Sequence, residues 1–125
     1  MSECITIELD AIPPSVNSAY RRARWKGMYM TRSAHIFKSM AAYIAAEEAK
    51  RQNWKMIPKG SFFKMRVGFA FKNYRFPDPN NLMKILIDAF EGILFENDKW
   101  LYVVMDPPRV TGKNRTVVKV YRPNI

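Results

Sequence analysis

Regular alternation of apolar and polar residues is clearest between residues 61 and 72. Every second residue from Phe63 to Phe71 is large and apolar, and the positions between them include Lys64 and Arg66. A period of two predicts a strand with one buried face, and here the other face should be positive. Weaker alternation predicts shorter strands at residues 5–9, 100–105 and 116–121.

A helix is predicted from about residue 33 to residue 54. Ser33 is placed to cap it, and five alanines between positions 41 and 49 favour helix and permit close approach of a neighbouring element. The large residues of one helical stripe are expected to face the core. That stripe consists of Ile36, Met40, Tyr43, Ile44 and Glu47.

A second, shorter helix follows Asp78, which stands between two prolines that disfavour helix before it. Asn80 or Asn81 is expected to cap it. Helical spacing predicts a buried face made of Leu82, Ile85, Leu86, Ala89, Phe90 and Ile93. The opposite stripe carries Asn81, Lys84, Asp88 and Glu91, and the chain then reaches Asp98. Carboxylates at the two ends of this helix are expected to meet around a hard cation.

The length and pattern of the chain predict one domain over residues 1–125. No repeat or linker divides the chain. The single cysteine, Cys4, excludes an internal disulfide framework, and no apolar run reaches the roughly 20 residues of a membrane span. We therefore expect a soluble, cytoplasmic protein with no membrane partner.

Charge is distributed unevenly along the chain. The net charge is +10, yet six of the eleven acidic residues lie between positions 78 and 106. Only Lys84 and Lys99 are basic in that window. An acidic island in a basic surface suits a metal-dependent enzyme acting on a phosphodiester backbone, because cations attract the strand while carboxylates hold the metal.

Two basic segments are candidates for DNA contact. Residues 20–31 interleave cations with aromatic rings, and Gly27 is suited to a hairpin; the alternative is a solvated hairpin with its aromatic residues packed beneath it. Residues 111–115 form a basic tip that either contacts phosphate or is a simple exposed loop. The predicted DNA-binding residues are Arg21, Arg22, Arg24, Lys26, Arg75, Lys84 and Lys113.

The residue types that remain for chemistry are oxygen donors. There is no CxxC, HExxH, GxxxxGK or Gly-x-Ser-x-Gly pattern, and His35 is the only histidine. An oxygen-only site suits Mg²⁺, with Mn²⁺ as a substitute. Asp78 and Asp98 fit the role of ligands, and Lys84 fits that of a cation that offsets transition-state charge. Acidic residues beside a helix start are also favoured by the helix dipole alone.

The acidic segment resembles the signature of the RusA family of Holliday junction resolvases. The similar parts are Asp78-Pro-Asn80-Asn81 with Lys84, then Asp88-Ala89-Phe90, then Asn97-Asp98, preceded by Pro13-Pro14-Ser15-Val16-Asn17 and Tyr29-Met30-Thr31. The resemblance implies a small α+β homodimer in which a small mixed β-sheet packs with two main helices and each subunit carries an acidic cluster. A further implication of the resemblance is that the protein binds four-way DNA junctions and nicks opposing strands by magnesium-dependent hydrolysis. It also implies that Asp78 and Asp98 bind the metal, that Lys84 is the essential lysine and that Asp88 is a supporting acid.

The chain departs from the family pattern at two positions. Asn80 stands where the motif has its second aspartate, and Asn97 replaces the first of two paired aspartates. An asparagine carbonyl can still contact a metal, but it brings no negative charge and cannot act as a base. We therefore expect weakened metal binding and reduced hydrolysis with junction binding retained, whether Asn80 is native or introduced.

Two other functions remain open from the sequence. One is a non-catalytic junction or duplex DNA-binding protein of the same fold, and the more distant one is an RNA-binding protein. Dimerisation is expected because two opposed cuts call for a two-fold protein. The large apolar residues around the acidic helix would either supply the interface or fill the monomer's core. They are Phe90, Ile93, Leu94, Phe95, Trp100 and Leu101.

Overall fold

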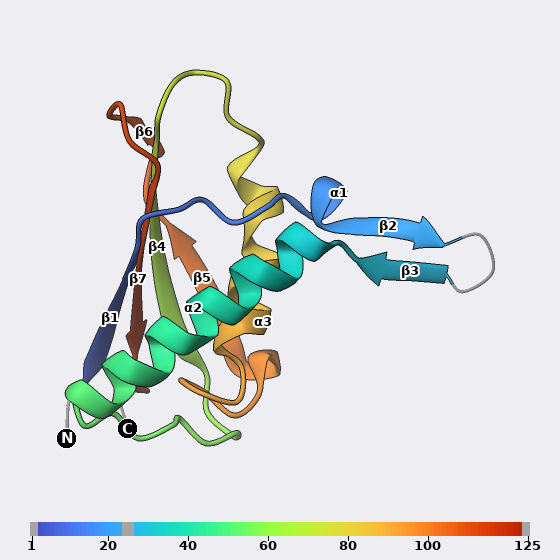
Figure 1. Cartoon of the computed structure of the whole chain (residues 1–125). Helices are drawn as coiled ribbons and strands as arrows, with labels where there is room; N and C mark the ends of the chain where they lie inside the picture. The colour runs from blue at the N-terminus through green and yellow to red at the C-terminus, as the bar shows by residue number, and fades with distance from the viewer. Residues whose placement is uncertain (1–2, 24–26, 124–125) are drawn as a thin grey trace.

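The fold is built on one mixed β-sheet. The computed structural model describes residues 3–23 and 27–123. The main strands lie in the order β1 (Cys4–Leu9), β7 (Arg115–Tyr121), β4 (Phe63–Phe71) and β5 (Leu101–Met105), as Figure 1 shows. β7 is antiparallel to both β1 and β4, whereas β5 and the short β6 (Arg109–Val110) run parallel to β4. The α+β class and all four predicted strands are therefore confirmed, whereas β6 was not predicted.

The central strand β4 owes its position to its sequence pattern. Phe63, Met65, Val67, Phe69 and Phe71 are all buried. Their alternation with more exposed residues is what one covered sheet face requires. The register places Val67 opposite Val118 of β7, and Val118 in turn lies opposite Ile7 of β1. These rows of β-branched and aromatic residues form the sheet side of the core.

Helix α2 (Arg32–Arg51) begins and ends a little earlier than the sequence pattern predicts. Thr31, and not Ser33, is its N-cap, because the Thr31 hydroxyl accepts a hydrogen bond from the Ala34 amide at 3.4 Å. At the other end Asn53 has a φ of 52°, in the left-handed region that stops a helix. The helix therefore ends at Arg51 and does not reach residue 54.

The prediction of which α2 face is buried was wrong. Ala34, Phe37, Ala41 and Ala45 lie in the core, whereas Ile36 and Tyr43 are 61% and 67% exposed. Met40 and Ile44 are partly buried, and Glu47 is exposed. The physical reason is close approach: a face of alanines lets α2 pack near β1 and α3, and the bulkier stripe is left outside.

The second helical segment consists of the 3₁₀ turn η1 (Pro79–Leu82) followed by α3 (Met83–Phe90). It is the crossover that joins β4 to the parallel strand β5, a connection that parallel strands require. Its buried residues are Leu82, Ile85, Leu86, Ala89 and Phe90, which confirms the predicted face. Ile93 lies beyond the end of the helix and is only partly buried.

The loop after α3 completes the core. Phe90, Leu94 and Phe95 have no exposed surface, and the ring centroids of Phe95 and Phe63 are 5.1 Å apart. The indole nitrogen of Trp54 donates to the Leu94 carbonyl at 3.0 Å. The other three residues considered for a dimer interface, Ile93, Trp100 and Leu101, are partly buried and packed against the same core. All six residues therefore belong to the hydrophobic core of the monomer or pack against it.

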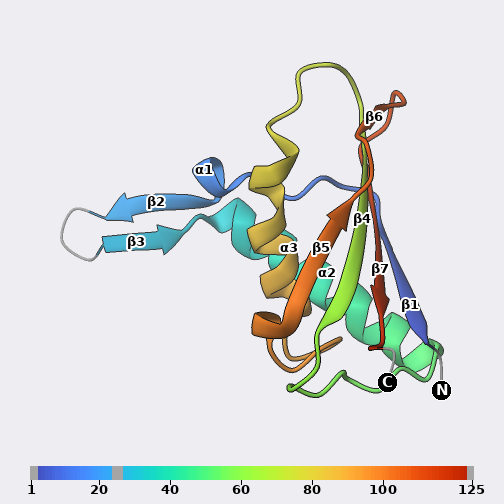
Figure 2. The ribbon, with the colours of Figure 1, turned by 180° about the vertical axis from the view of Figure 1, so that it is seen from behind.

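A two-stranded hairpin projects from this body (Figures 1 and 2). It consists of β2 (Tyr20–Ala23) and β3 (Gly27–Met30), and it follows a short helix, α1 (Val16–Ala19), that the sequence pattern does not predict. The Thr31 amide donates to the Ala19 carbonyl at 2.7 Å and closes the base of the hairpin. The predicted hairpin is confirmed. Among the described helices, none combines the length and the apolar character that crossing a bilayer requires.

The orientation of α2, with Phe37 buried and Ile36 exposed, predicts how two substitutions affect stability. Phe37→Ala should lower the free energy of unfolding by about 3–5 kcal/mol, because it opens a cavity in the core. Ile36→Ala, one position earlier on an exposed face, should cost less than about 1 kcal/mol. Urea unfolding followed by circular dichroism measures both. Equal losses would contradict the helix orientation described above.

Candidate functional site

The amino end of the acidic helix is organised by Asp78. Its Oδ1 accepts hydrogen bonds from the Asn80 amide at 3.0 Å and from the Asn80 side-chain nitrogen at 3.1 Å. Asp78 is therefore the N-cap of η1, and the prediction that Asn80 or Asn81 caps the helix was wrong. Pro79 follows at the first helical position, where a missing N–H costs nothing. Asp78 and Asn80 are both exposed to solvent.

The side-chain amide of Asn80 has an electrostatic consequence for Asp78. A neutral donor sits against the Asp78 carboxylate, where an aspartate at position 80 would bring a second negative charge. Two carboxylates at this separation repel unless a cation or a proton lies between them. Asn80 therefore avoids the carboxylate repulsion that an aspartate at this position would add.

A second set of charged side chains lies along α3 and just beyond its carboxyl end. Glu91, the C-cap of α3, accepts a hydrogen bond from the Asp98 amide through Oε2 at 2.8 Å. Lys84 lies 3.6 Å from Asp88 through Nζ and Oδ2. Asp98 opens the 3₁₀ turn η2 (Asp98–Trp100), which is capped by Asn97. Sequence reasoning placed Glu91 on the polar stripe of the helix but gave it no role.

The electrostatic potential around Asp98, at the carboxyl end of α3, disfavours negative charge. Burial raises the pKa of Asp98. The negative charge of Glu91 and a hydrogen bond between the two carboxyl groups raise this pKa further, whereas the positive charge of Lys84 lowers it. The carboxyl end of α3 adds the partial negative charge of its unpaired carbonyls. Adjacent oxygen donors in a negative potential are the donor set that a divalent cation such as Mg²⁺ prefers, so Glu91 and Asp98 fit a metal ion.

The two ends of the acidic helix lie far apart. At about 2.0 Å per residue in η1 and 1.5 Å in α3, the segment spans roughly 20 Å. Figure 2 shows its amino end near the end of β4, while β5 starts beside its carboxyl end. Within residues 3–23 and 27–123, no three Asp, Glu, His or Cys side chains are grouped so that they could hold one ion. Asp78 caps η1, the Asp98 amide binds Glu91 beyond α3, and the roles of the two aspartates as ligands remain predictions.

The predicted DNA-binding residues are distributed over several elements. Arg21 and Arg22 lie on β2, and Arg24 and Lys26 fall outside the described residues. Arg75 is exposed in the loop before η1, and Lys113 is exposed in the tip between β6 and β7. That loop and that tip lie at the same end of the sheet, because the Lys72 amide donates to Asn114 Oδ1 at 2.8 Å. Lys84 lies along the exposed side of α3.

Residues 11–121 match the profile of the endodeoxyribonuclease RusA family. The match covers most of the 125 residues, so the chain belongs to this family, and the resemblance noted from its motifs is confirmed. Membership implies an endodeoxyribonuclease of the Holliday junction resolvase type, a class that acts on junction DNA and generally depends on a divalent metal. No curated protein matches the chain.

The acidic pair makes a prediction about stability in the absence of metal. The pKa of Asp98 is raised in the folded protein, so the stability associated with this group is present at low pH and is lost as pH rises through the folded pKa. Asp98→Asn should therefore raise the melting temperature at pH 8 in EDTA, by about one or two degrees, and the difference should shrink toward pH 4. Differential scanning calorimetry measures it. A variant less stable than the parent at pH 8 would contradict the repulsion described here.

Proposed function

We propose that this protein is a structure-specific endodeoxyribonuclease that nicks opposing strands of four-way DNA junctions, using Mg²⁺ or Mn²⁺ and acting as a homodimer. The observation that carries the proposal is the family match over residues 11–121, with Asp78, Lys84 and Asp98 at the positions of the acidic motif. The net charge of +10 supports a polyanionic substrate. Arg21, Arg22, Arg24, Lys26, Arg75 and Lys113 are the proposed backbone contacts.

The proposed chemistry needs few protein groups. A bound divalent ion supplies polarisation of the phosphate and a lower pKa for attacking water. Asp98 and Glu91 would hold it at the carboxyl end of α3, and Asp78 with the Asn80 carbonyl offers oxygen donors at the amino end. Lys84, already oriented by Asp88 at 3.6 Å, would offset the negative charge that develops on the phosphate. Catalysis would then consist of positioning and charge compensation.

The separation of Asp78 and Asp98 supports a site shared by two protomers. One ion contacts ligands within about 2–3 Å, so it cannot touch both ends of a segment of roughly 20 Å. In a two-fold dimer, the amino end of the helix in one protomer can face the carboxyl end in the other. Each of two equivalent sites would then combine Asp78 of one chain with Asp98 of its partner. The homodimer proposal rests on this incompleteness, since the apolar residues first considered for an interface are buried or partly buried in the monomer's core.

Asn80 is the proposed cause of a low cleavage rate. Its amide brings no charge to the metal, so the ion should bind more weakly than to an aspartate. The DNA phosphates would also be repelled less by a neutral asparagine at position 80 than by an aspartate. We therefore propose that junction binding is retained while hydrolysis is reduced.

Restoring the family residue tests this proposal. Asn80→Asp should raise the rate of cleavage of a synthetic four-way junction in Mg²⁺ or Mn²⁺ by about tenfold or more, which corresponds to 1.4 kcal/mol or more of transition-state stabilisation. Asp78→Asn should abolish residual cleavage while gel-shift affinity in EDTA persists. Equally fast cleavage by Asn80→Asp and the parent would reject the role given to Asn80.

A complementation experiment tests the shared site. Asp78→Asn and Asp98→Asn should each be inactive, and mixing them should restore single-strand nicking. In a mixed dimer one site lacks both aspartates and the other keeps both, so the dimer nicks one strand and does not resolve the junction. Sedimentation of the mixture at micromolar concentration checks that dimers form. If each chain carries a complete site, mixing restores nothing.

The second candidate is a junction or duplex DNA-binding protein without chemistry. The observation that favours it is the loss of two motif carboxylates, at Asn80 and Asn97, in one chain. This candidate predicts that neither Asn80→Asp nor Mn²⁺ yields cleavage, although the junction is bound tightly.

A further inference from the structure

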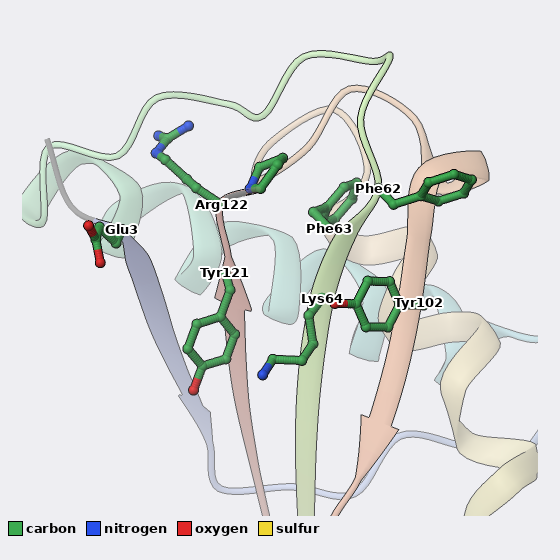
Figure 3. A pocket seen from close by; sticks show the side chains of 8 residues that line it. Glu3, Phe62, Phe63, Lys64, Tyr102, Tyr121 and Arg122 are labelled. Atoms are coloured by element: carbon green, nitrogen blue, oxygen red, sulfur yellow. The ribbon is translucent and has the colours of Figure 1, made fainter. Parts of the chain in front are cut away.

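Within the part of the chain that the structure describes, one face of the main sheet carries no helix. In Figure 3 the side chains of Lys64, Tyr102 and Tyr121 stand on the viewer's side of the sheet, and the helices lie behind it. Two hollows of about 370 Å³ and 680 Å³ occupy this face and share Tyr121 between them. We call this surface the open sheet face.

Aromatic rings are exposed on this face. Tyr102 is 51% exposed and Phe62 is 67% exposed, although large aromatic residues usually gain stability by burial. Tyr102 lies opposite Lys64 on β4, and Lys64 in turn lies opposite Tyr121 on β7. The Lys64 ammonium is 4.5 Å from the centroid of the Tyr121 ring. Lys64 of β4 therefore lies between the Tyr102 ring of β5 and the Tyr121 ring of β7.

The open sheet face is also positively charged. The two hollows are lined by five basic and two acidic side chains. Arg66 lies directly opposite Lys119, a like-charge pairing that destabilises an antiparallel sheet. Asp106 binds Arg66 at 2.8 Å, whereas among the described residues no ion pair is found for Lys119. An unbalanced cation pair on an open surface suits an anionic ligand.

We propose that the open sheet face binds single-stranded DNA, with bases stacked on Tyr102 and Phe62 and phosphates held by Lys64 and Lys119. Stacking platforms on sheets combined with cations are how proteins hold single strands without reading their sequence. A second copy of the chain would be a poor occupant, because it would place the same excess of positive charge against itself. This binding requires no metal and does not depend on the proposed nuclease chemistry.

The surface would serve a role distinct from that of the acidic helix. It lies on the face opposite α2 and α3, so a strand bound here can be held while another part of the DNA lies near the hairpin or the acidic residues. The chemistry of the surface fits unpaired bases, which arise where duplex arms open at a branch point. Duplex DNA conceals its base faces and should bind here only through phosphates.

Fluorescence anisotropy of a labelled 20-nucleotide single strand, in EDTA and with the full chain, tests the proposal. Tyr102→Ala should weaken binding about fivefold or more, because each stacked base contributes on that scale, while Tyr102→Phe should retain affinity. Tyr43→Ala is the matched control, since Tyr43 is also an exposed tyrosine, on the outer side of α2. Circular dichroism confirms that each variant is folded.

Charge reversal gives a second, independent readout. Lys64→Glu with Lys119→Glu should reduce the magnitude of the negative slope of log affinity against log salt by about 1.4 or more, the value for two lost single-strand phosphate contacts. Lys38→Glu with Lys59→Glu makes the same change of net charge away from this face and should alter the slope less. In the unaltered protein, a strand carrying 5-iodouracil should crosslink to the peptides that contain Phe62 and Tyr102.

Three results would overturn the proposal. Equal losses in the sheet-face and control variants would show that binding follows net charge alone. Crosslinks confined to other segments, with no effect of Tyr102→Ala, would place the strand elsewhere. A shift from dimer to monomer on Lys64→Glu with Lys119→Glu would identify the face as an interface between copies of this chain. None of these measurements depends on junction cleavage, so a negative result would reject single-strand binding at the open sheet face without rejecting the nuclease proposal.

Discussion

Burial of the apolar face of η1 and α3 determines where this protein can present its acidic residues. Leu82, Ile85, Leu86, Ala89 and Phe90 are all buried, so the helix cannot rotate or slide without exposing them. Because α3 connects two parallel strands, its two ends must lie at opposite ends of the sheet. Asp78 and Asp98 flank this segment and are held apart by it. We therefore propose that a second chain completes the metal site.

The strands and the acidic helix could be predicted from the sequence because their periodicity is strong. Helix α2 shows where that reasoning fails. Its large residues follow a good helical stripe, yet Ala41 and Ala45 are buried and Tyr43 is exposed, since the packing of a helix on its neighbours depends on close approach as well as on apolar area. The caps were also misjudged: Thr31 and Asp78 each stand earlier in the chain than the predicted cap residues.

The candidate site could be predicted in part. The residue types and their order along the chain predict Asp78, Lys84 and Asp98 as site residues, and the family match supports the class of enzyme but not these positions. The spatial relation between the two aspartates could not be predicted from local pattern, because it depends on β5 pairing parallel to β4. Glu91 was overlooked for a related reason. Only the return of the chain after α3 brings the Asp98 amide to its carboxylate, and the signal available beforehand was its place on the same polar stripe as Lys84 and Asp88.

Negative charge at the ends of α3 and positive charge on the open sheet face together suggest a protein that keeps its chemistry and its strand binding on different surfaces. A crystal of the protein soaked in Mn²⁺, with anomalous data collected, tests the central claim directly. The shared-site account predicts a manganese peak between Asp98 of one protomer and Asp78 of the partner subunit, with Glu91 as a further ligand. A peak bound by Asp98 and Glu91 alone, with Asp78 of every chain remote from metal, would contradict it.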